Sequence, residues 1–223
     1  MLLYLYSVLT GLNKGAFADC VSLTSVVIPD SVINIGASVF SGCSGLTDVT
    51  ISGSVVNIGN YAFSGCSGLT DVTIPSSVVN IGNYTFSSCS SLMRVTIQSG
   101  VASIGYGVFS NCYSLASIEI PGSVTSIGDS AFSDCSSLTC VVIPNSVTGI
   151  GEHAFYGCKS LTSVTIPSSV TKIGWCAFYE CSRLTNVTFN GTVEEWKNVE
   201  KGSSWLRDTK VTVIKCSDGD INL

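Results

Sequence analysis

Residues 161–183 read LTSVTIPSSVTKIGWCAFYECSR, and this pattern recurs every 23 residues along the chain. No insertion breaks the register over eight copies, so the period belongs to most of the chain and not to one segment. The clearest column of equivalent positions holds a cysteine in each copy: Cys20, Cys43, Cys66, Cys89, Cys112, Cys135, Cys158 and Cys181. Phenylalanine, leucine and glycine form further columns at the same spacing. Such a period is typical of a solenoid, in which each repeat packs on the next.

The first half of each repeat has the pattern of a half-buried β-strand. Val164 and Ile166 alternate with serine and threonine, so we expect the apolar residues to face the core and the polar ones to face water. In five copies a proline such as Pro167 follows and ends the strand, because proline has no N–H to donate. The period and the Leu-x-x-Val-x-Ile spacing predict a leucine-rich-repeat solenoid with parallel strands from residues 26–28 to residues 187–189.

The second half of the repeat predicts the other sides of the coil. Val170 and Ile173 follow at helix-like spacing, and the next residue is a glycine, which indicates either a positive φ or close packing of one coil on another. Ala-Phe-x-x-Cys is then expected to form about one helical turn on the opposite side, with the phenylalanine in the coil centre. Asn60, Asn83 and Asp129 stand where they could cap that turn.

These columns together point to a known family. The pattern Leu-x-x-Val-x-Ile-Pro-x-x-Val-x-x-Ile-Gly-x-x-Ala-Phe-x-x-Cys-x-x-Leu closely resembles the BspA-like leucine-rich repeats, also called the Treponema pallidum type, over residues 3 to about 196. The resemblance implies a curved, right-handed solenoid with a concave parallel sheet and short helical or 3-10 turns on its convex side. It also implies adhesion or protein binding at a cell surface or after secretion, as in surface proteins of bacteria and trichomonads. No catalytic motif comes with it.

Composition limits the classes of function. The chain has 223 residues, of which 45% are hydrophobic and 11% charged, and its net charge is −5. An acidic chain without basic patches is not expected to bind nucleic acid. No apolar run reaches the roughly 20 residues of a membrane-spanning helix, so membrane insertion is not expected. Nor does any motif call for a cofactor.

The first residues allow two interpretations. An apolar run from Leu2 to Leu12 and an Ala-Phe-Ala before Asp19 look like a signal peptide with its cleavage site. However, no positive charge precedes the run, and Leu3 and Leu5 fall in the strand columns of the repeat. We therefore interpret this segment as an incomplete first coil, either of a longer array or of a short relative.

This first coil has consequences for assembly. The first coil has no neighbour before it in the sequence, and Tyr4 and Tyr6 flank its leucines, which are Leu3, Leu5, Leu9 and Leu12. Uncovered strand edges with apolar side chains attract other chains. A homodimer through the N-terminal coil is the expected product, because one patch then serves both partners.

Composition changes near the C-terminus. Residues 192–223 hold 11 charged residues, against 14 in residues 1–191. We therefore divide the chain into a solenoid, residues 1–191, and a C-terminal cap, residues 192–223. Thr192 and Glu195 have the spacing of a capping box that opens a short helix. After the helix we expect a loop over 201–208, a final strand over 211–215 and a turn over 217–220.

The cysteines and the single histidine raise the question of chemistry. The column cysteines are expected to be buried free thiols, since Cys-x-x-Cys metal spacings are absent. Cys140 lies in an outward strand column, so its thiol is expected to be exposed. Cys176 and His153 share a column on what we expect to be an exposed convex turn. They are either unrelated residues or, as a remote alternative, the nucleophile and base of a thiol enzyme.

The outward strand columns are the expected functional surface, because solenoids bind partners through such concave faces. Charged residues occur only in the middle of these columns. The candidate ligand-binding residues are Asp48, Thr50, Asp71, Thr73, Arg94, Thr96 and Glu119. No metal site is expected, since two stacked aspartates are too few ligands for calcium. The sequence therefore predicts a non-catalytic scaffold that binds a protein, peptide or glycan. The alternative is a structural spacer within a longer surface protein.

Overall fold

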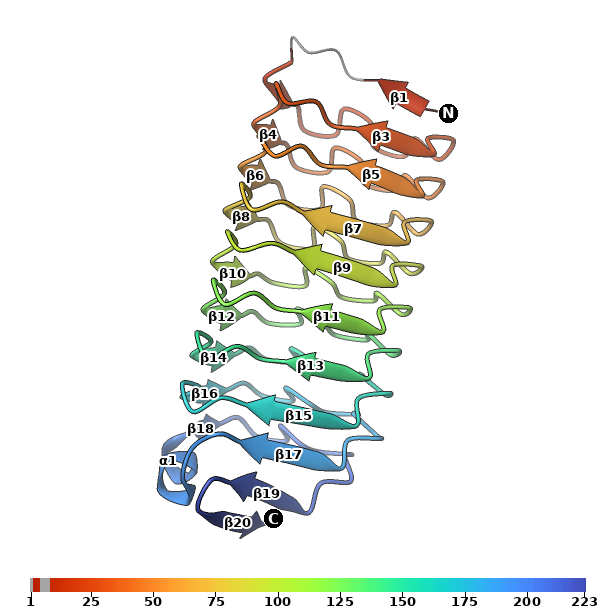
Figure 1. Ribbon diagram of the computed structural model, residues 1–223. Helices are drawn as coiled ribbons and strands as arrows, with labels where there is room; N and C mark the ends of the chain where they lie inside the picture. Colours follow the sequence, from red (N-terminus) through yellow and green to blue (C-terminus); the bar gives the residue numbers. More distant parts are fainter. Residues whose placement is uncertain (1, 5–8) are drawn as a thin grey trace.

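The computed structural model describes residues 2–4 and 9–223 and is a right-handed solenoid of parallel β-coils (Figure 1). Each coil gives one strand to a front sheet and a two-residue strand to a back sheet, and then returns through turns. The predicted leucine-rich-repeat solenoid is confirmed, with little helix.

The strands of the front sheet are β1 (Leu2–Tyr4), β3 (Ser25–Val27), β5 (Asp48–Thr50), β7 (Asp71–Ile74), β9 (Arg94–Ile97), β11 (Ser117–Glu119), β13 (Cys140–Val142), β15 (Ser163–Ile166), β17 (Asn186–Phe189) and β19 (Val213–Cys216). The strands of the back sheet are β2 (Gly11–Leu12), β4 (Asn34–Ile35), β6 (Asn57–Ile58), β8 (Asn80–Ile81), β10 (Ser103–Ile104), β12 (Ser126–Ile127), β14 (Gly149–Ile150), β16 (Lys172–Ile173) and β18 (Glu200–Lys201). They pair in two ladders, from β2 to β8 and from β10 to β18.

Paired strands of successive repeats keep a register of one repeat. Val26 lies beside Val49 in the front sheet, and Ile127 lies beside Ile150 in the back sheet. The predicted parallel front strands are confirmed, although most begin one residue earlier than expected. The back strands were not predicted. Val170 and Ile173 have the spacing of a helix, but Val170 closes a turn on the Pro167 carbonyl (3.1 Å) and Ile173 lies in β16, so the helix-like interpretation is wrong.

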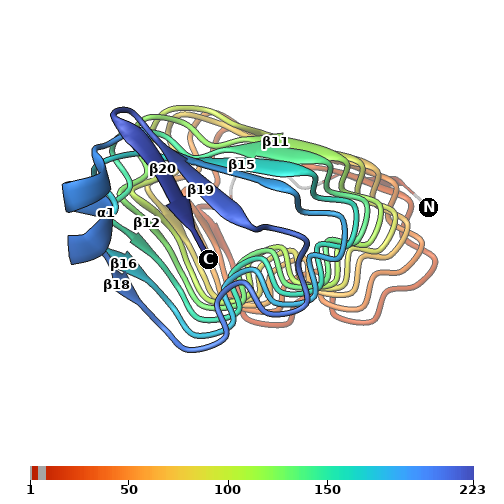
Figure 2. The same cartoon turned by 90° about the horizontal axis from the view of Figure 1, so that it is seen from below.

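The third side of each coil, which we call the turn face, holds a run of overlapping tight turns (Figure 2). In one coil three N–H groups each donate to the carbonyl three residues earlier: Ala62 to Gly59 (3.3 Å), Ser64 to Tyr61 (3.1 Å) and Cys66 to Phe63 (3.2 Å). The third residues of the first and last of these turns, Tyr61 and Gly65, have φ of 57° and 73°. A positive φ at that position is typical of a type II turn and stops a right-handed helix. The expected helical turn is therefore not formed, and α1 (Val193–Asn198) is the only α-helix among the described residues.

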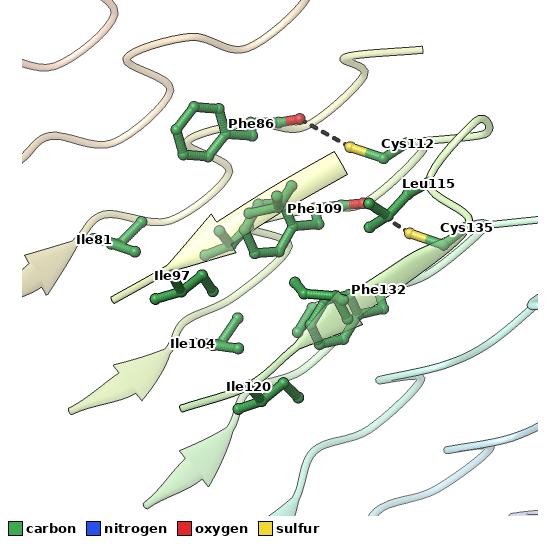
Figure 3. Packing of buried hydrophobic residues seen from close by; sticks show 14 of the residues in the cluster. Ile81, Phe86, Ile97, Ile104, Phe109, Cys112, Leu115, Ile120, Phe132 and Cys135 are labelled. Atoms are coloured by element: carbon green, nitrogen blue, oxygen red, sulfur yellow. Dashed lines mark hydrogen bonds between the residues drawn. The ribbon is translucent and has the colours of Figure 1, made fainter. Parts of the chain in front are cut away.

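A column of stacked phenylalanine rings fills the interior (Figure 3). Neighbouring rings lie 5.1–5.7 Å apart between centroids and are tilted by at most 15°. The stack consists of Phe17, Phe40, Phe63, Phe86, Phe109, Phe132, Phe155 and Phe178. From Phe40 onward these side chains are fully buried, so each coil covers the ring of the one before it.

The cysteine column ties each coil to the previous one. The Cys112 thiol donates to the Phe86 carbonyl and the Cys135 thiol to the Phe109 carbonyl, both at 3.2 Å (Figure 3). From Cys43 to Cys181 the column is buried and all its cysteines are free, which confirms the predicted thiol ladder. Burial raises the pKa of the Cys112 thiol well above its ordinary value, so the S–H donor is retained at neutral pH.

The glycine column is explained by close packing and not by a positive φ. None of these glycines, all of which lie in the described part of the chain, has a positive φ. A Cβ added at Gly151 would lie 2.5 Å from the backbone nitrogen of Asp129, and one at Gly174 would lie 2.4 Å from that of Glu152. Only glycine permits the backbones of two coils to approach this closely.

The predicted caps have a different role. Asn60 Oδ1 accepts a hydrogen bond from the backbone N–H of Asn83 (2.8 Å), and Asp129 Oδ1 accepts one from Glu152 (2.8 Å). Asn83 Oδ1 likewise accepts a hydrogen bond from the backbone N–H of Tyr106 in the next coil (3.2 Å). These side chains therefore link successive coils. The capping prediction is wrong because no helix begins in their own coil.

The C-terminal residues continue both sheets. The capping box is confirmed: Thr192 Oγ1 accepts from Glu195 N (3.2 Å) and Glu195 Oε2 accepts from Thr192 N (2.7 Å). Lys201 belongs to β18, so the loop begins one residue later than expected. β20 (Gly219–Asn222) pairs antiparallel with β19 at the end of the stack (Figure 2). The turn predicted over 217–220 is therefore shorter than expected, because residues 219 and 220 belong to β20. The division at residue 191 stays a prediction.

At the other end β1 pairs with β3, and Leu3 lies beside Val26. Leu12 is buried and Leu3 packs partly against the core, whereas Leu9 is exposed. Leu5 and Tyr6 lie outside the described residues, and the homodimer stays a prediction. Within the described chain no helix is long and apolar enough to cross a bilayer.

We expect Gly151→Ala to lower the free energy of unfolding by about 1–3 kcal/mol, because the new methyl group must push the backbone of the preceding coil away. Gly149→Ala is the matched control two residues earlier. An added Cβ there meets nothing within 4 Å, so its unfolding midpoint in urea should equal or slightly exceed that of the parent chain. Equal midpoints for the two variants would contradict the close-packing explanation.

Candidate functional site

The outer face of the front sheet, here called the front face, carries the predicted ligand-binding residues. The strand pleat turns alternate side chains outward, and those of β5, β7, β9 and β11 are exposed at every outward position. The charged side chains of these strands lie next to one another in four successive coils: Asp48, Asp71, Arg94 and Glu119. Apart from Lys215 on β19, the charged side chains of the front strands therefore lie in the middle of the front face.

A first groove lies between β5 and β7. It has a volume of about 340 Å³, and Asp48, Thr50, Asp71 and Thr73 line it. The ladder of the front sheet stops here, since no backbone hydrogen bond joins β5 to β7 in the described chain. Asp48 and Asp71 occupy equivalent positions across this step, and like charges on opposed residues weaken strand pairing. The groove thus coincides with the one unpaired step among the described front strands.

A second groove lies between β9 and β11, where the ladder is intact. Its volume is about 250 Å³, and its outward lining includes Arg94, Thr96, Ser117 and Glu119. Thr96 and Glu119 are register partners, so a hydroxyl stands beside a carboxylate. The seven predicted residues are thus divided between two adjacent grooves, but their role in binding stays a prediction.

An ion pair joins the two grooves. The Arg94 guanidinium lies 3.4 Å from the Asp71 carboxylate, and both side chains are more than half exposed. A pair this exposed contributes only about 0–1 kcal/mol to stability. Asp48 instead accepts a hydrogen bond from the Ser25 hydroxyl (3.2 Å). These charged groups therefore do little for folding and remain accessible to a partner.

Cys140 is exposed on β13, as predicted, and its neighbour Val142 is the most exposed valine of the front face at 69%. Neither residue lines the two grooves. The thiol can therefore report on the front face without belonging to the candidate site.

Cys176 and His153 lie together on the turn face. Both line a hollow of about 580 Å³. Cys176 is only 3% exposed, so the expectation that it lies on an exposed turn is wrong. Its burial raises the pKa of the thiol, and nearby Arg207 offsets this only in part. Within the described residues no hydrogen bond joins the thiol to the imidazole, and a thiol whose pKa is raised holds little of the reactive thiolate at neutral pH.

Comparison with known proteins identifies the family. A family model described as a BspA-type leucine-rich-repeat region matches residues 10–139 and 125–200. The chain therefore belongs to the BspA-type leucine-rich-repeat proteins, as the resemblance in its columns indicated. No curated protein matches the chain closely.

Solved structures with the same fold come from several bacteria. A leucine-rich-repeat protein of Bacteroides ovatus has 26% identity and a TM-score of 0.71, over 93% of this chain and 64% of the other. The Treponema pallidum leucine-rich-repeat protein has 30% identity and a TM-score of 0.56, over 78% of this chain and 71% of the other. The pneumococcal vaccine antigen PcpA, at 19% identity and a TM-score of 0.57, shares the fold over 95% of this chain and 60% of its own. This chain spans about two thirds of the length of these proteins.

We expect iodoacetamide to label Cys140 in the native protein well before Cys89 or Cys112. Cys140 is exposed, whereas Cys89 and Cys112 are fully buried and burial raises the pKa of each thiol well above its ordinary value. Mass spectrometry of the digested protein gives the labelling rate at each site. Cys140→Ser should remove the fast labelling phase and leave the slow labelling of the buried cysteines. Disulfides between successive column cysteines would contradict the assignment of these residues as buried free thiols.

Proposed function

We propose that the chain is a non-catalytic scaffold that binds a partner protein through the two grooves of the front face. The observation that carries this proposal is that the charged residues of the four strands β5, β7, β9 and β11 lie together where they stabilise the fold least. Asp71 and Arg94 form an exposed pair of low energetic value. Repeat solenoids use extended outer surfaces of this kind to bind other proteins.

The chemistry of the grooves favours a polypeptide among the predicted ligand classes. Carboxylates, a guanidinium and threonine hydroxyls alternate within about 14 Å, since three strand spacings of about 4.8 Å separate the outer members of the set. A polypeptide can match both signs of charge at such spacings, and complementary charges give specificity and register.

The unpaired step adds a second feature that suits a polypeptide. No hydrogen bond of a β5–β7 ladder occupies the backbone groups on the facing edges of these strands. Backbone groups without a ladder partner can accept or donate hydrogen bonds to a polypeptide bound over the groove. The groove between β5 and β7 is the larger of the two, so we place the main contact there.

We further propose a cell-surface location and no enzymatic role. The location rests on the resemblance to BspA-like surface proteins. The lack of a catalytic role rests on the fold, which is typically a binding scaffold, and on Cys176, whose thiol is buried and protonated.

We expect Asp71→Ala with Arg94→Ala to weaken peptide binding at least about tenfold, or about 1.4 kcal/mol. Peptides are first selected on the parent chain from a phage-displayed random library, and their affinities are measured by biolayer interferometry. The matched control is Lys172→Ala with Glu200→Ala, which removes another exposed ion pair across coils, at 3.2 Å on the back sheet. That variant should bind like the parent chain.

Two outcomes would contradict the proposal. Equal affinities of the selected peptides for the front-face variant and the parent chain would place binding elsewhere on the solenoid. A library that yields no saturable binder would instead favour a structural spacer without a ligand of its own.

A further inference from the structure

The turn face carries a hollow that the front-face proposal does not use. Its residues come from five successive repeats, from Tyr106 to Arg207. The lining side chains that matter here are Tyr106, Ser130, Ser133, His153, Tyr156 and Trp175. The volume of about 580 Å³ lies within the roughly 300–1,000 Å³ of ligand sites.

A change of residue size between neighbouring repeats creates this hollow. Ser130 and Ser133 occupy the positions that His153 and Tyr156 occupy one repeat later. The two serines therefore form a low floor, while aromatic side chains rise on the coils beside it. Because the backbones of these coils are held in register, the missing volume is not filled by a shift of the chain.

The aromatic wall is held in place by its own contacts. The ring centroids of His153 and Trp175 lie 4.6 Å apart at 87°, and those of Tyr156 and Tyr179 lie 5.4 Å apart. Trp175 and Tyr106 are nevertheless 44% and 42% exposed. Large aromatic surfaces left in water at the two sides of one hollow mark a ligand site more often than a packing site.

Polar groups line the same hollow without giving it a strong charge. The floor offers serine hydroxyls, which both donate and accept hydrogen bonds. The Tyr156 hydroxyl donates to Glu180 (3.1 Å), and the Arg207 guanidinium lies over the Tyr179 ring at 5.6 Å. The carboxylates of Glu180, Asp134 and Asp208 lie near these tyrosines and outnumber Arg207, so the hollow does not attract an anionic ligand.

We propose that this hollow binds a neutral oligosaccharide. A sugar ring has C–H groups on its faces, which suit the electron-rich faces of Trp175 and Tyr106, and hydroxyls on its rim, which suit the serines. A purely apolar ligand would leave the serine hydroxyls of the floor without partners, at a cost in affinity. The site extends over five repeats, or roughly 19 Å at about 4.8 Å per coil, so it fits several sugar units.

The other ligand class that binds aromatic grooves is a proline-rich peptide. Such a peptide needs a row of aromatic slots along its length. Here serines interrupt the aromatic side chains between Tyr106 and His153, and this interruption favours the sugar.

The test uses saturation-transfer NMR with neutral cello-, malto-, manno- and N-acetylglucosamine oligomers, followed by calorimetry on any that bind. Ser133→Tyr extends the existing tyrosine column into the hollow and should weaken binding at least about tenfold, or about 1.4 kcal/mol. Ser64→Tyr makes the same change in the same column outside the hollow and should leave the affinity unchanged. Trp175→Ala should weaken binding as Ser133→Tyr does. Equal urea midpoints show that the variants are folded.

Several results would overturn the proposal. These are no binding of any oligomer at millimolar concentration, full binding by Ser133→Tyr, or binding of a proline-rich peptide in place of the sugars. The Asp71→Ala, Arg94→Ala variant separates the two proposals. It should bind the oligosaccharide normally, and loss of sugar binding in that variant would place the sugar on the front face.

Discussion

Close approach of successive coil backbones is the constraint on which this structure depends. Backbone hydrogen bonds join most neighbouring coils on all three sides, for example from Ile28 N to Thr50 O (2.9 Å) at the front and from Phe63 N to Thr85 O (2.9 Å) on the turn face. The ladder lapses only between β5 and β7 at the front and between β8 and β10 at the back of the described chain. A residue therefore lies above its own equivalent in the next coil. Every column must hold side chains that tolerate a copy of themselves at about 4.8 Å.

The buried columns satisfy this constraint in different ways. Phenylalanine rings stack nearly in parallel, and the cysteine thiol is small enough to fit beside them while it donates to a carbonyl of the previous coil. Gly151 and its equivalents leave room where two backbones meet. Since these columns fix the coil, the outward columns can vary without loss of fold. The charged grooves and the aromatic hollow both arise where the outward residues change from one coil to the next.

Much of the fold could be predicted from the sequence because the period makes each feature visible eight times. The front strands, the buried thiols and the capping box of Thr192 follow from local patterns. The back strands could not be recognised, since a two-residue strand such as Lys172–Ile173 is too short to show an alternating pattern. The cap assigned to Asn60 was wrong because an amide can bond the next coil as readily as its own.

The candidate site was predictable only in part. The outward charges in the middle of the columns indicated the candidate residues of the front face. They did not indicate that the ladder between β5 and β7 is missing, because strand pairing there depends on how the like charges of Asp48 and Asp71 meet across two coils. The exposure of Cys176 was misjudged because its own column gives no sign that the next coil covers it. The sequence does contain a sign of the hollow: small serines stand at positions 130 and 133, between the aromatic residues of neighbouring repeats.

The most direct test of this account is the urea unfolding of two deletion variants. Removal of residues 93–115 takes out one repeat of 23 residues, so every later column still lies above its equivalent. Removal of residues 93–114 leaves the next part of the chain one residue out of register, which turns strand side chains to the wrong face. We expect a cooperative transition for the first variant, at a slightly lower midpoint than the parent chain, and a much lower midpoint for the second. Equal midpoints would contradict the claim that the register between coils determines the structure.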